Sequence, residues 1–233
     1  MAASAPDAPS TPPAPRRWGG LLVRATSAIV LAPLVLAALW FGFPWLDLVA
    51  ALAAPIMVSE CVRLTPRRPL RRLAAIVYVL AALVALLWLR HQPQSGRETV
   101  LWIVVCVWAT DIGAYFLGKL AGGVKLAPRI SPGKTWSGLI GGVCWSAVAS
   151  AAMGLVFQLG ETLPLALIGA ALAVVAQAGD LLESAAKRDA GVKDSGTIIP
   201  GHGGLLDRVD GLIAVLVAVA LARLALGGNW PWA

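Results

Sequence analysis

The sequence predicts an all-α, polytopic integral membrane protein with about seven transmembrane helices, in a range of about six to nine. Of its 233 residues, 58% are hydrophobic and 13% are charged, whereas an ordinary soluble domain has about 25% charged residues. A compact domain of this length has too little interior to hide so many apolar side chains from water. No segment shows the alternation of a membrane β-barrel strand, so we expect the spans to be helices.

Seven apolar segments, each nearly long enough to span a bilayer as a helix, predict the positions of these helices. The two firmest lie over residues 73–89 and 137–159, because neither run contains a charged side chain. The first two are less regular, since Pro33 and the Gly42-Phe43-Pro44 break would also allow a broken pair of shorter helices. The full set covers residues 25–43, 46–62, 73–89, 99–118, 137–159, 163–186 and 211–227.

The remaining segments complete the expected organisation of the chain. Residues 1–17 are rich in Pro, Ala and Ser, which predicts a disordered cytoplasmic tail. The apolar stretch that follows lacks a convincing cleavage site, so we expect a mature membrane anchor and not a signal peptide. Residues 18–98 should form amino-terminal membrane helices, and residues 99–233 a catalytic membrane domain with cytoplasmic loops at 118–136 and 187–210.

Positive charges predict the orientation of the spans. The chain has 19 Lys and Arg residues and a net charge of +7. With about seven spans, roughly sixteen of these residues fall on one side, and only Arg90 and Arg97 lie in loops on the other. The positive-inside rule places the basic side in the cytoplasm, which predicts a bacterial-type inner membrane and contact with anionic lipid headgroups. Nucleic acid is not an expected partner, and a homodimer remains open.

A cluster of acidic residues lies between positions 180 and 210. If the sixth helix continues beyond the membrane, Asp180, Ser184 and Lys187 share one face of it. Asp180 ends an apolar run, and an unpaired charge at membrane depth is costly, so this residue is a functional candidate. Asp207 and Asp210 lie at the start of the last helix, where they could also simply complement the helix dipole.

A glycine-rich loop connects these acidic helix ends. Gly201, Gly203 and Gly204 can expose backbone N–H groups to a bound anion. Carboxylates that hold a hard cation such as Mg²⁺, next to N–H groups and basic side chains that bind phosphate, would form a metal–phosphate site. His202 is either a phosphate donor or a residue that fixes the loop.

The other long loop is basic and carries hydroxyl groups. Its candidate substrate-binding residues are Lys125, Ser131, Lys134 and Thr135. A Walker phosphate-binding motif is excluded, because its first glycine would fall on Pro128 and no strand is expected before it. The segment suits phosphate or lipid headgroups, although an ordinary positive-inside loop would look similar. Asp111, alone among apolar neighbours, is the acidic partner that we expect for these basic groups.

Several motifs together resemble the signature of the integral-membrane phosphatidate cytidylyltransferases. The similarity is clear from about residue 108 to 211 and vague elsewhere. Its segments are Asp111-Ile112-Gly113-Ala114-Tyr115-Phe116, Lys125 to Pro128, Ile130 to Trp136, Ser184-Ala185-Ala186-Lys187-Arg188, Lys193-Asp194-Ser195-Gly196 and Pro200-Gly201-His202-Gly203-Gly204-Leu205-Leu206-Asp207-Arg208-Val209-Asp210.

This resemblance implies an enzyme that joins CTP to phosphatidic acid, giving CDP-diacylglycerol and pyrophosphate for phospholipid synthesis. It implies that Asp180 and Asp207 hold Mg²⁺ together with a second cation. The lipid headgroup is expected to enter through an opening between helices near Asp111 and the loop at residues 125–136. The candidate catalytic residues are Asp180, Lys187, Asp207 and Asp210, and the candidate substrate-binding residues include Asp111, Ser184, Arg188, Lys193, Asp194 and Arg208.

Two other functions remain open at this point. An ion-coupled membrane transporter could use Asp111 and Asp180 along its path. A CTP-dependent lipid-alcohol kinase would transfer the γ-phosphate and release CDP. A CDP-alcohol phosphotransferase is excluded, because its Asp-Gly-x-x-Ala-Arg pattern is missing.

Overall fold

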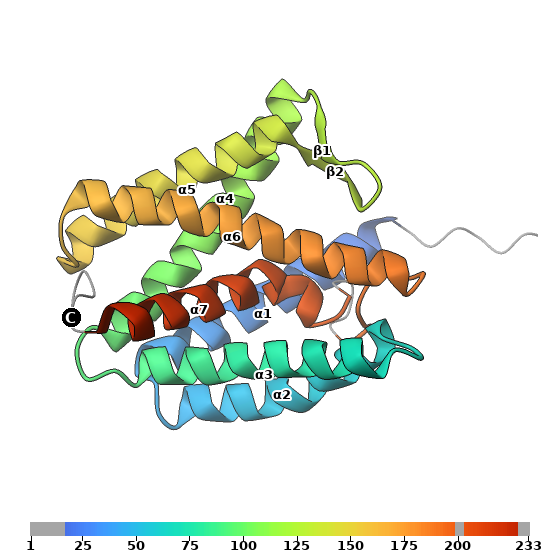
Figure 1. Ribbon diagram of the computed structural model, residues 1–233, viewed down its shortest axis with the longest axis horizontal. Coiled ribbons are helices and arrows are strands. Elements are labelled where there is room, and N and C mark those ends of the chain that lie inside the picture. Colours follow the sequence, from blue (N-terminus) through green and yellow to red (C-terminus); the bar gives the residue numbers. More distant parts are fainter. Residues whose placement is uncertain (1–16, 199–202, 228–233) are drawn as a thin grey trace, which may run out of the picture.

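The computed structural model describes residues 17–198 and 203–227, and over these residues it forms a bundle of seven helices and one small hairpin (Figure 1). Helices α2 to α7 are each long and apolar enough to cross a membrane, while the apolar part found in α1, Ile29–Phe41, is shorter. The all-α polytopic fold is thus confirmed. The helices are α1 (Arg17–Phe41), α2 (Trp45–Leu64), α3 (Pro69–Arg90), α4 (Gly96–Ala121), α5 (Trp136–Phe157), α6 (Thr162–Asp189) and α7 (Leu206–Leu226).

Each predicted apolar segment corresponds to one of these helices. α1 continues through Pro33 and α2 through Pro55, so the alternative of shorter broken helices is wrong. The chain turns between them at Gly42, whose φ of +73° is a left-handed conformation that glycine adopts readily. The predicted tail at residues 1–17 lies outside the described residues, apart from Arg17 at the start of α1.

A short antiparallel hairpin, which the sequence interpretation omitted, occupies the loop between α4 and α5. Its strands are β1 (Lys125–Ala127) and β2 (Ser131–Thr135). Strands of three and five residues are too short to show a hydrophobic period. Thr135 ends the hairpin and caps α5, because its Oγ1 accepts a hydrogen bond from Gly138 N at 3.1 Å. The hairpin therefore has a fixed position at the start of a membrane helix.

Helices α4, α5 and α6 pack closely through small residues. A Cβ added at Gly113 of α4 would lie 2.6 Å from Gly141 O of α5. A Cβ at Gly169 of α6 would lie 2.4 Å from the Cβ of Ser150. Ser150 also accepts a buried hydrogen bond from Trp102 Nε1 at 2.8 Å. Close approach through small residues and hydrogen bonds between helices stabilise helix packing in a lipid environment.

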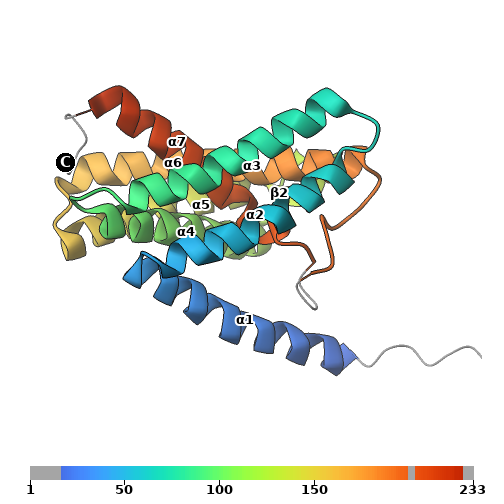
Figure 2. The ribbon, with the colours of Figure 1, turned by 90° about the horizontal axis from the view of Figure 1, so that it is seen from below.

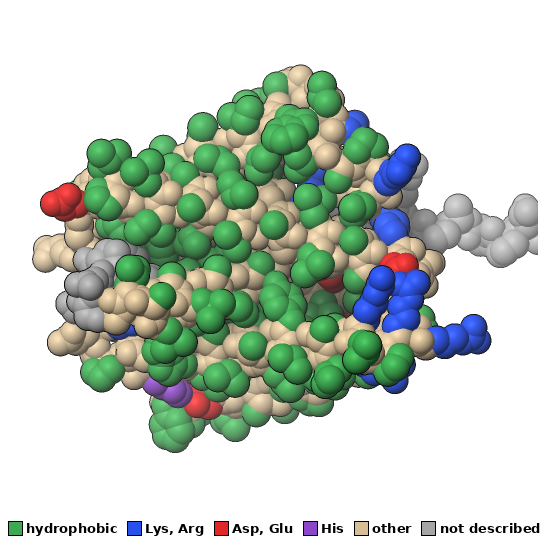
Figure 3. All heavy atoms as spheres, viewed as in Figure 1, with side chains coloured by type: hydrophobic (Ala, Val, Ile, Leu, Met, Phe, Trp, Pro, Cys, Tyr) green, Lys and Arg blue, Asp and Glu red, His purple; other side chains and the backbone are tan. Residues whose placement is uncertain are grey.

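The arrangement of the bundle puts α6 at its centre. α6 lies between the α4–α5 pair and α7, and α3 and α2 follow on the far side of α7 (Figure 1). α1 lies at the edge of the bundle, against α2 and α4 (Figure 2). Figure 3 shows Lys and Arg side chains gathered at one end of the molecule, around the last residues of α6. The polar end of α6 therefore lies within a basic surface.

Candidate active site

Two cavities flank the carboxyl-terminal half of α6. The smaller, of about 470 Å³, lies between α4, the hairpin, α5 and α6, and Asp111, Lys134 and Asp180 line it. The larger, of about 840 Å³, lies between α2, α3, α6 and α7, and Glu183 and Asp210 line it. Because residues 180 and 183 are adjacent on a helical surface, α6 presents a carboxylate to each cavity.

In the smaller cavity, Lys134 and Asp180 form an ion pair. Lys134 Nζ lies 2.6 Å from Asp180 Oδ2 and also donates to Gln177 Oε1 at 2.9 Å. Ser184 Oγ donates to Asp180 Oδ1 at 3.2 Å. The structure thus joins three residues singled out in the sequence, from the hairpin and from α6, and adds Gln177. Asp111 and Thr135 line the same cavity, but Lys134 pairs with Asp180 and not with Asp111.

A second polar cluster links α6 to the start of α7. Lys187 Nζ lies 2.7 Å from Asp207 Oδ1 and 3.2 Å from Glu183 Oε2. The Glu183 carboxyl also contacts that of Asp210, while no donor from the described residues reaches the buried Glu183 Oε1. Asp210 in turn lies within electrostatic range of Asp180. Lys187 therefore neutralises carboxylates of two helices: Glu183, its neighbour on α6, and Asp207 of α7.

Asp207 organises the segment that precedes α7. Its Oδ2 accepts hydrogen bonds from Ser195 N at 2.8 Å, Ser195 Oγ at 3.0 Å and Gly204 N at 2.9 Å. Gly203 has a φ of +87°, and a Cβ there would lie 2.9 Å from Asp207 Oδ2. The Gly204 N–H, expected to bind a ligand anion, thus binds a carboxylate of the protein itself. Gly201 and His202 lie outside the described residues.

Glu60 of α2 is a site residue that the sequence analysis missed. Its side chain is fully buried, Oε1 accepts from Leu205 N at 2.9 Å, and Oε2 accepts from Leu206 N at 2.8 Å. Ser195 Oγ lies 3.0 Å from the same Oε2. This carboxylate caps the start of α7, where free N–H groups favour negative charge. An acidic residue inside a predicted apolar span was a detectable signal, similar to the one that identified Asp111.

The remaining candidates lie around the two cavities. Arg188 lines the larger cavity and donates to Ile130 O of the hairpin at 3.3 Å. Lys125 and Ser131 begin the two strands of the hairpin. Lys193, Asp194 and Arg208 are exposed near the start of α7. The structure thus divides the predicted residues between the smaller cavity, the Lys187 cluster and a surrounding exposed surface.

The oxygen ligands around Asp180 fit a hard cation. From the residues that the structure describes, each Asp180 oxygen accepts one bond, which leaves acceptor capacity on both. Asp207 Oδ2 accepts from two backbone N–H groups and shares the Ser195 hydroxyl with Glu60, whereas Oδ1 accepts one bond, from Lys187, and has more remaining capacity. Within the described residues, no three Asp, Glu, His or Cys side chains form a ready-made metal cage. Mg²⁺ is commonly held by one or two carboxylates plus substrate phosphates and water. Metal binding by Asp180 and Asp207 stays a prediction.

Replacing Lys187 with alanine should lower turnover at least about tenfold, which corresponds to roughly 1.4 kcal/mol of transition-state stabilisation. The change removes the cation between Glu183 and Asp207. Initial rates per folded molecule, normalised by thermal unfolding in detergent, measure the effect. Lys187→Arg is the control, because it keeps the charge and should retain more activity. An unchanged rate in Lys187→Ala would limit this lysine to a role in membrane topology.

Comparisons with known proteins agree with the family resemblance of the sequence. Residues 68–225 match the Cytidylyltransferase family. The proteins named phosphatidate cytidylyltransferase from Brucella suis and Pseudomonas aeruginosa are 45% and 42% identical, over 64% and 69% of this chain and 55% and 60% of their own lengths. The one from Rickettsia bellii is 37% identical over 85% of this chain and 88% of its own length.

The match to the family covers most of the chain, all residues that line the smaller cavity and most of those that line the larger one. The matched range contains the hairpin, α6 and the start of α7, and therefore the polar clusters described above. Glu60, which caps α7, lies before the matched range. The aligned part spans only about half the length of the first Brucella relatives, at 55%. The chain belongs to the Cytidylyltransferase family.

Proposed function

We propose that this protein transfers the cytidylyl group of CTP to phosphatidic acid, giving CDP-diacylglycerol and pyrophosphate in phospholipid biosynthesis. The observation that carries the proposal is the pair of cavities on α6, one with the Lys134–Asp180 pair and one with largely apolar walls. A reaction between a water-soluble triphosphate and a membrane lipid needs a polar and an apolar site side by side. The names of the relatives support the same reaction.

The reaction requires two polyanions to meet. A phosphate oxygen of phosphatidic acid attacks the α-phosphorus of CTP. The bond between that phosphorus and the oxygen bridging to the β-phosphorus breaks, and pyrophosphate leaves with the electron pair. The lipid phosphate is already anionic near neutral pH, so no strong base is needed. Catalysis therefore depends on positioning and on neutralising negative charge.

The residues of α6 and the hairpin are suited to this task. In the proposed complex, Lys134 and Lys187 bind phosphate oxygens in place of part of their present carboxylate contacts. Ser184 orients Asp180, and Asp210 orients Glu183. Asp180 and Asp207, whose Oδ1 now accepts a hydrogen bond from Lys187, would hold Mg²⁺, and the ion would supply positive charge to offset that of the phosphate groups.

The proposal also places the site on the cytoplasmic side of a bacterial inner membrane. The supporting observation is the basic end of the molecule around the last turn of α6 (Figure 3), which the positive-inside rule assigns to the cytoplasm. A single cysteine introduced at Lys193 should react with a membrane-impermeant reagent only after the inner membrane is opened. Reaction in intact spheroplasts would show that the site lies on the outer face, where cellular CTP does not reach it, and would contradict the proposal.

The direct test is product analysis with purified protein in detergent. With CTP, Mg²⁺ and short-chain phosphatidic acid, we expect stoichiometric pyrophosphate and CDP-diacylglycerol. Diacylglycerol in place of phosphatidic acid should give neither product. Formation of CDP and a phosphorylated lipid alcohol would identify a kinase, and no CTP turnover at all would favour a transporter.

A further inference from the structure

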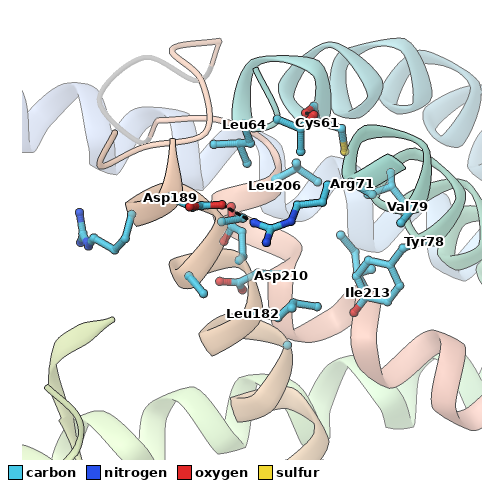
Figure 4. Close-up of a pocket in the computed structure, with 18 of the residues that line it drawn as sticks. Cys61, Leu64, Arg71, Tyr78, Val79, Leu182, Asp189, Leu206, Asp210 and Ile213 are labelled. Atoms are coloured by element: carbon cyan, nitrogen blue, oxygen red, sulfur yellow. Dashed lines mark hydrogen bonds and ion pairs between the residues drawn. The ribbon is translucent and has the colours of Figure 1, made fainter. Parts of the chain in front are cut away.

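The larger cavity combines apolar walls with a basic opening. Its volume of about 840 Å³ falls in the range of pockets for small organic ligands, about 300–1,000 Å³. Figure 4 shows Val79 and Tyr78 of α3 facing Leu182 of α6 and Ile213 of α7 across the cavity. These walls belong to helices long enough to span a membrane. An apolar chain would therefore be the preferred occupant of this part.

Arginines surround the other end of the cavity. Arg68, just before α3, and Arg71 of α3 both contact a single oxygen, Oδ2 of Asp189. The Arg71 contact is 2.5 Å long (Figure 4). Arg188, at the end of α6, lines the same cavity. Three guanidinium groups thus share the opening with the Asp189 carboxylate, which leaves an excess of positive charge there. Arg68 and Arg71 side chains are 47% and 65% exposed, so an incoming ligand can reach them.

We infer that the larger cavity is the binding site for the acceptor lipid, with its phosphomonoester at Arg68 and Arg71 and an acyl chain along the apolar wall. The inference rests on the proposed function and states where its lipid substrate binds. It differs from the expectation of a headgroup entrance near Asp111. The cavity at Asp111 has about half the volume and is lined by Lys119, Lys134 and Gln177, which suits the triphosphate of the nucleotide.

The chemistry of the opening favours a phosphomonoester over other anions. A guanidinium group offers parallel N–H donors that match phosphate oxygens, and two such groups match a charge between −1 and −2. Asp189 now occupies the position in which two phosphate oxygens would sit. A carboxylate brings one negative charge, so a phosphomonoester balances the arginines better. Asp189 is thus a counter-ion that the lipid phosphate replaces.

The position of the cavity also suits transfer to the nucleotide. Glu183 and Asp210 line it, and both belong to the polar cluster that extends toward Asp180. Figure 4 places Asp210 between the Arg71–Asp189 contact and Ile213. The larger cavity thus extends from the arginines to residues of the cluster proposed for catalysis.

Steady-state kinetics with Arg71→Ala test the assignment. We expect the KM for phosphatidic acid to rise about tenfold while the KM for CTP stays within about twofold. Asp189→Asn should lower the KM for the lipid about threefold, because it removes the competing carboxylate. Arg63→Ala is the matched control: Arg63 is exposed at the end of α2 but does not line the cavity. An increase in the KM for CTP, or an unchanged KM for the lipid, would overturn the inference.

Photo-crosslinking provides a readout that does not depend on turnover. Phosphatidic acid with a diazirine in one acyl chain should label peptides that contain Val79, Leu182 or Ile213. Unlabelled short-chain phosphatidic acid should compete, whereas inorganic phosphate and diacylglycerol should not. Labelling confined to α4 or α5, or equal competition by inorganic phosphate, would refute the lipid site. Labelling of the cavity by a protein that releases no pyrophosphate would instead refute the proposed reaction and leave the lipid site standing.

Discussion

Turnover of CTP should fall at least about a hundredfold when Asp180 is replaced by asparagine. The substitution keeps the size of the side chain but removes the charge that pairs with Lys134 at 2.6 Å. It also removes the carboxylate that best fits a divalent cation in the smaller cavity. Pyrophosphate release by purified protein at saturating CTP and lipid measures the loss.

The control for this prediction lies at the other end of the same helix. Glu161 is exposed just before α6, far along the chain from the site, and Glu161→Gln should keep normal turnover. Both variants should insert into the membrane and unfold at similar temperatures. Near-normal activity of Asp180→Asn would eliminate the metal assignment and the role of the Lys134–Asp180 pair.

Glu60→Gln should reduce turnover at least about tenfold and lower stability by about 2–3 kcal/mol. Both carboxylate oxygens of Glu60 accept hydrogen bonds, from Leu205 N, Leu206 N and Ser195 Oγ. An amide has only one oxygen, so its NH₂ group would face a donor in a fully buried position. We expect faster hydrogen exchange of the amides at positions 204–206, measured by mass spectrometry, together with the lower rate.

Met57→Ala distinguishes positioning by Glu60 from a general loss of packing. Met57 lies one turn earlier on α2 and is 2% exposed within an apolar cluster. Its truncation should cost about 2–5 kcal/mol but leave the α7 cap and the rate per folded molecule unchanged. If both variants show the same kinetics and the same exchange at 204–206, Glu60 has a structural role only.

The sequence predicted the helices well because their signal is local. Length and hydropathy define each span. For example, the uncharged run predicted as a helix at 137–159 is α5, which ends two residues earlier, at Phe157. The pairing of Ser184 with Asp180 follows from helical spacing alone. Lys134 was identified as a phosphate-binding candidate by its charge and its loop, and the structure places it in the smaller cavity.

Contacts between distant segments could not be predicted in the same way. Glu60 and Leu205 are separated by 145 positions, and only the packing of α2 against the start of α7 brings them together. Lys187 keeps its helical neighbour Glu183 at 3.2 Å, but its shorter contact, at 2.7 Å, is with Asp207 of another helix. Arg68 and Arg71 looked like ordinary cytoplasmic charges, since nothing in their spacing revealed the cavity beside them.

The Ser195 hydroxyl lies 3.0 Å from carboxylate oxygens of both Glu60 and Asp207. It carries one hydrogen, so it can satisfy only one of them at a time. Glu60 belongs to the first 67 residues, which precede the family match. These residues thus supply one of the two acceptors of the Ser195 hydroxyl and also the cap of α7. A fragment starting at residue 68 would leave the amides of Leu205 and Leu206 without this acceptor, so the start of α7 in the matched segment depends on α2.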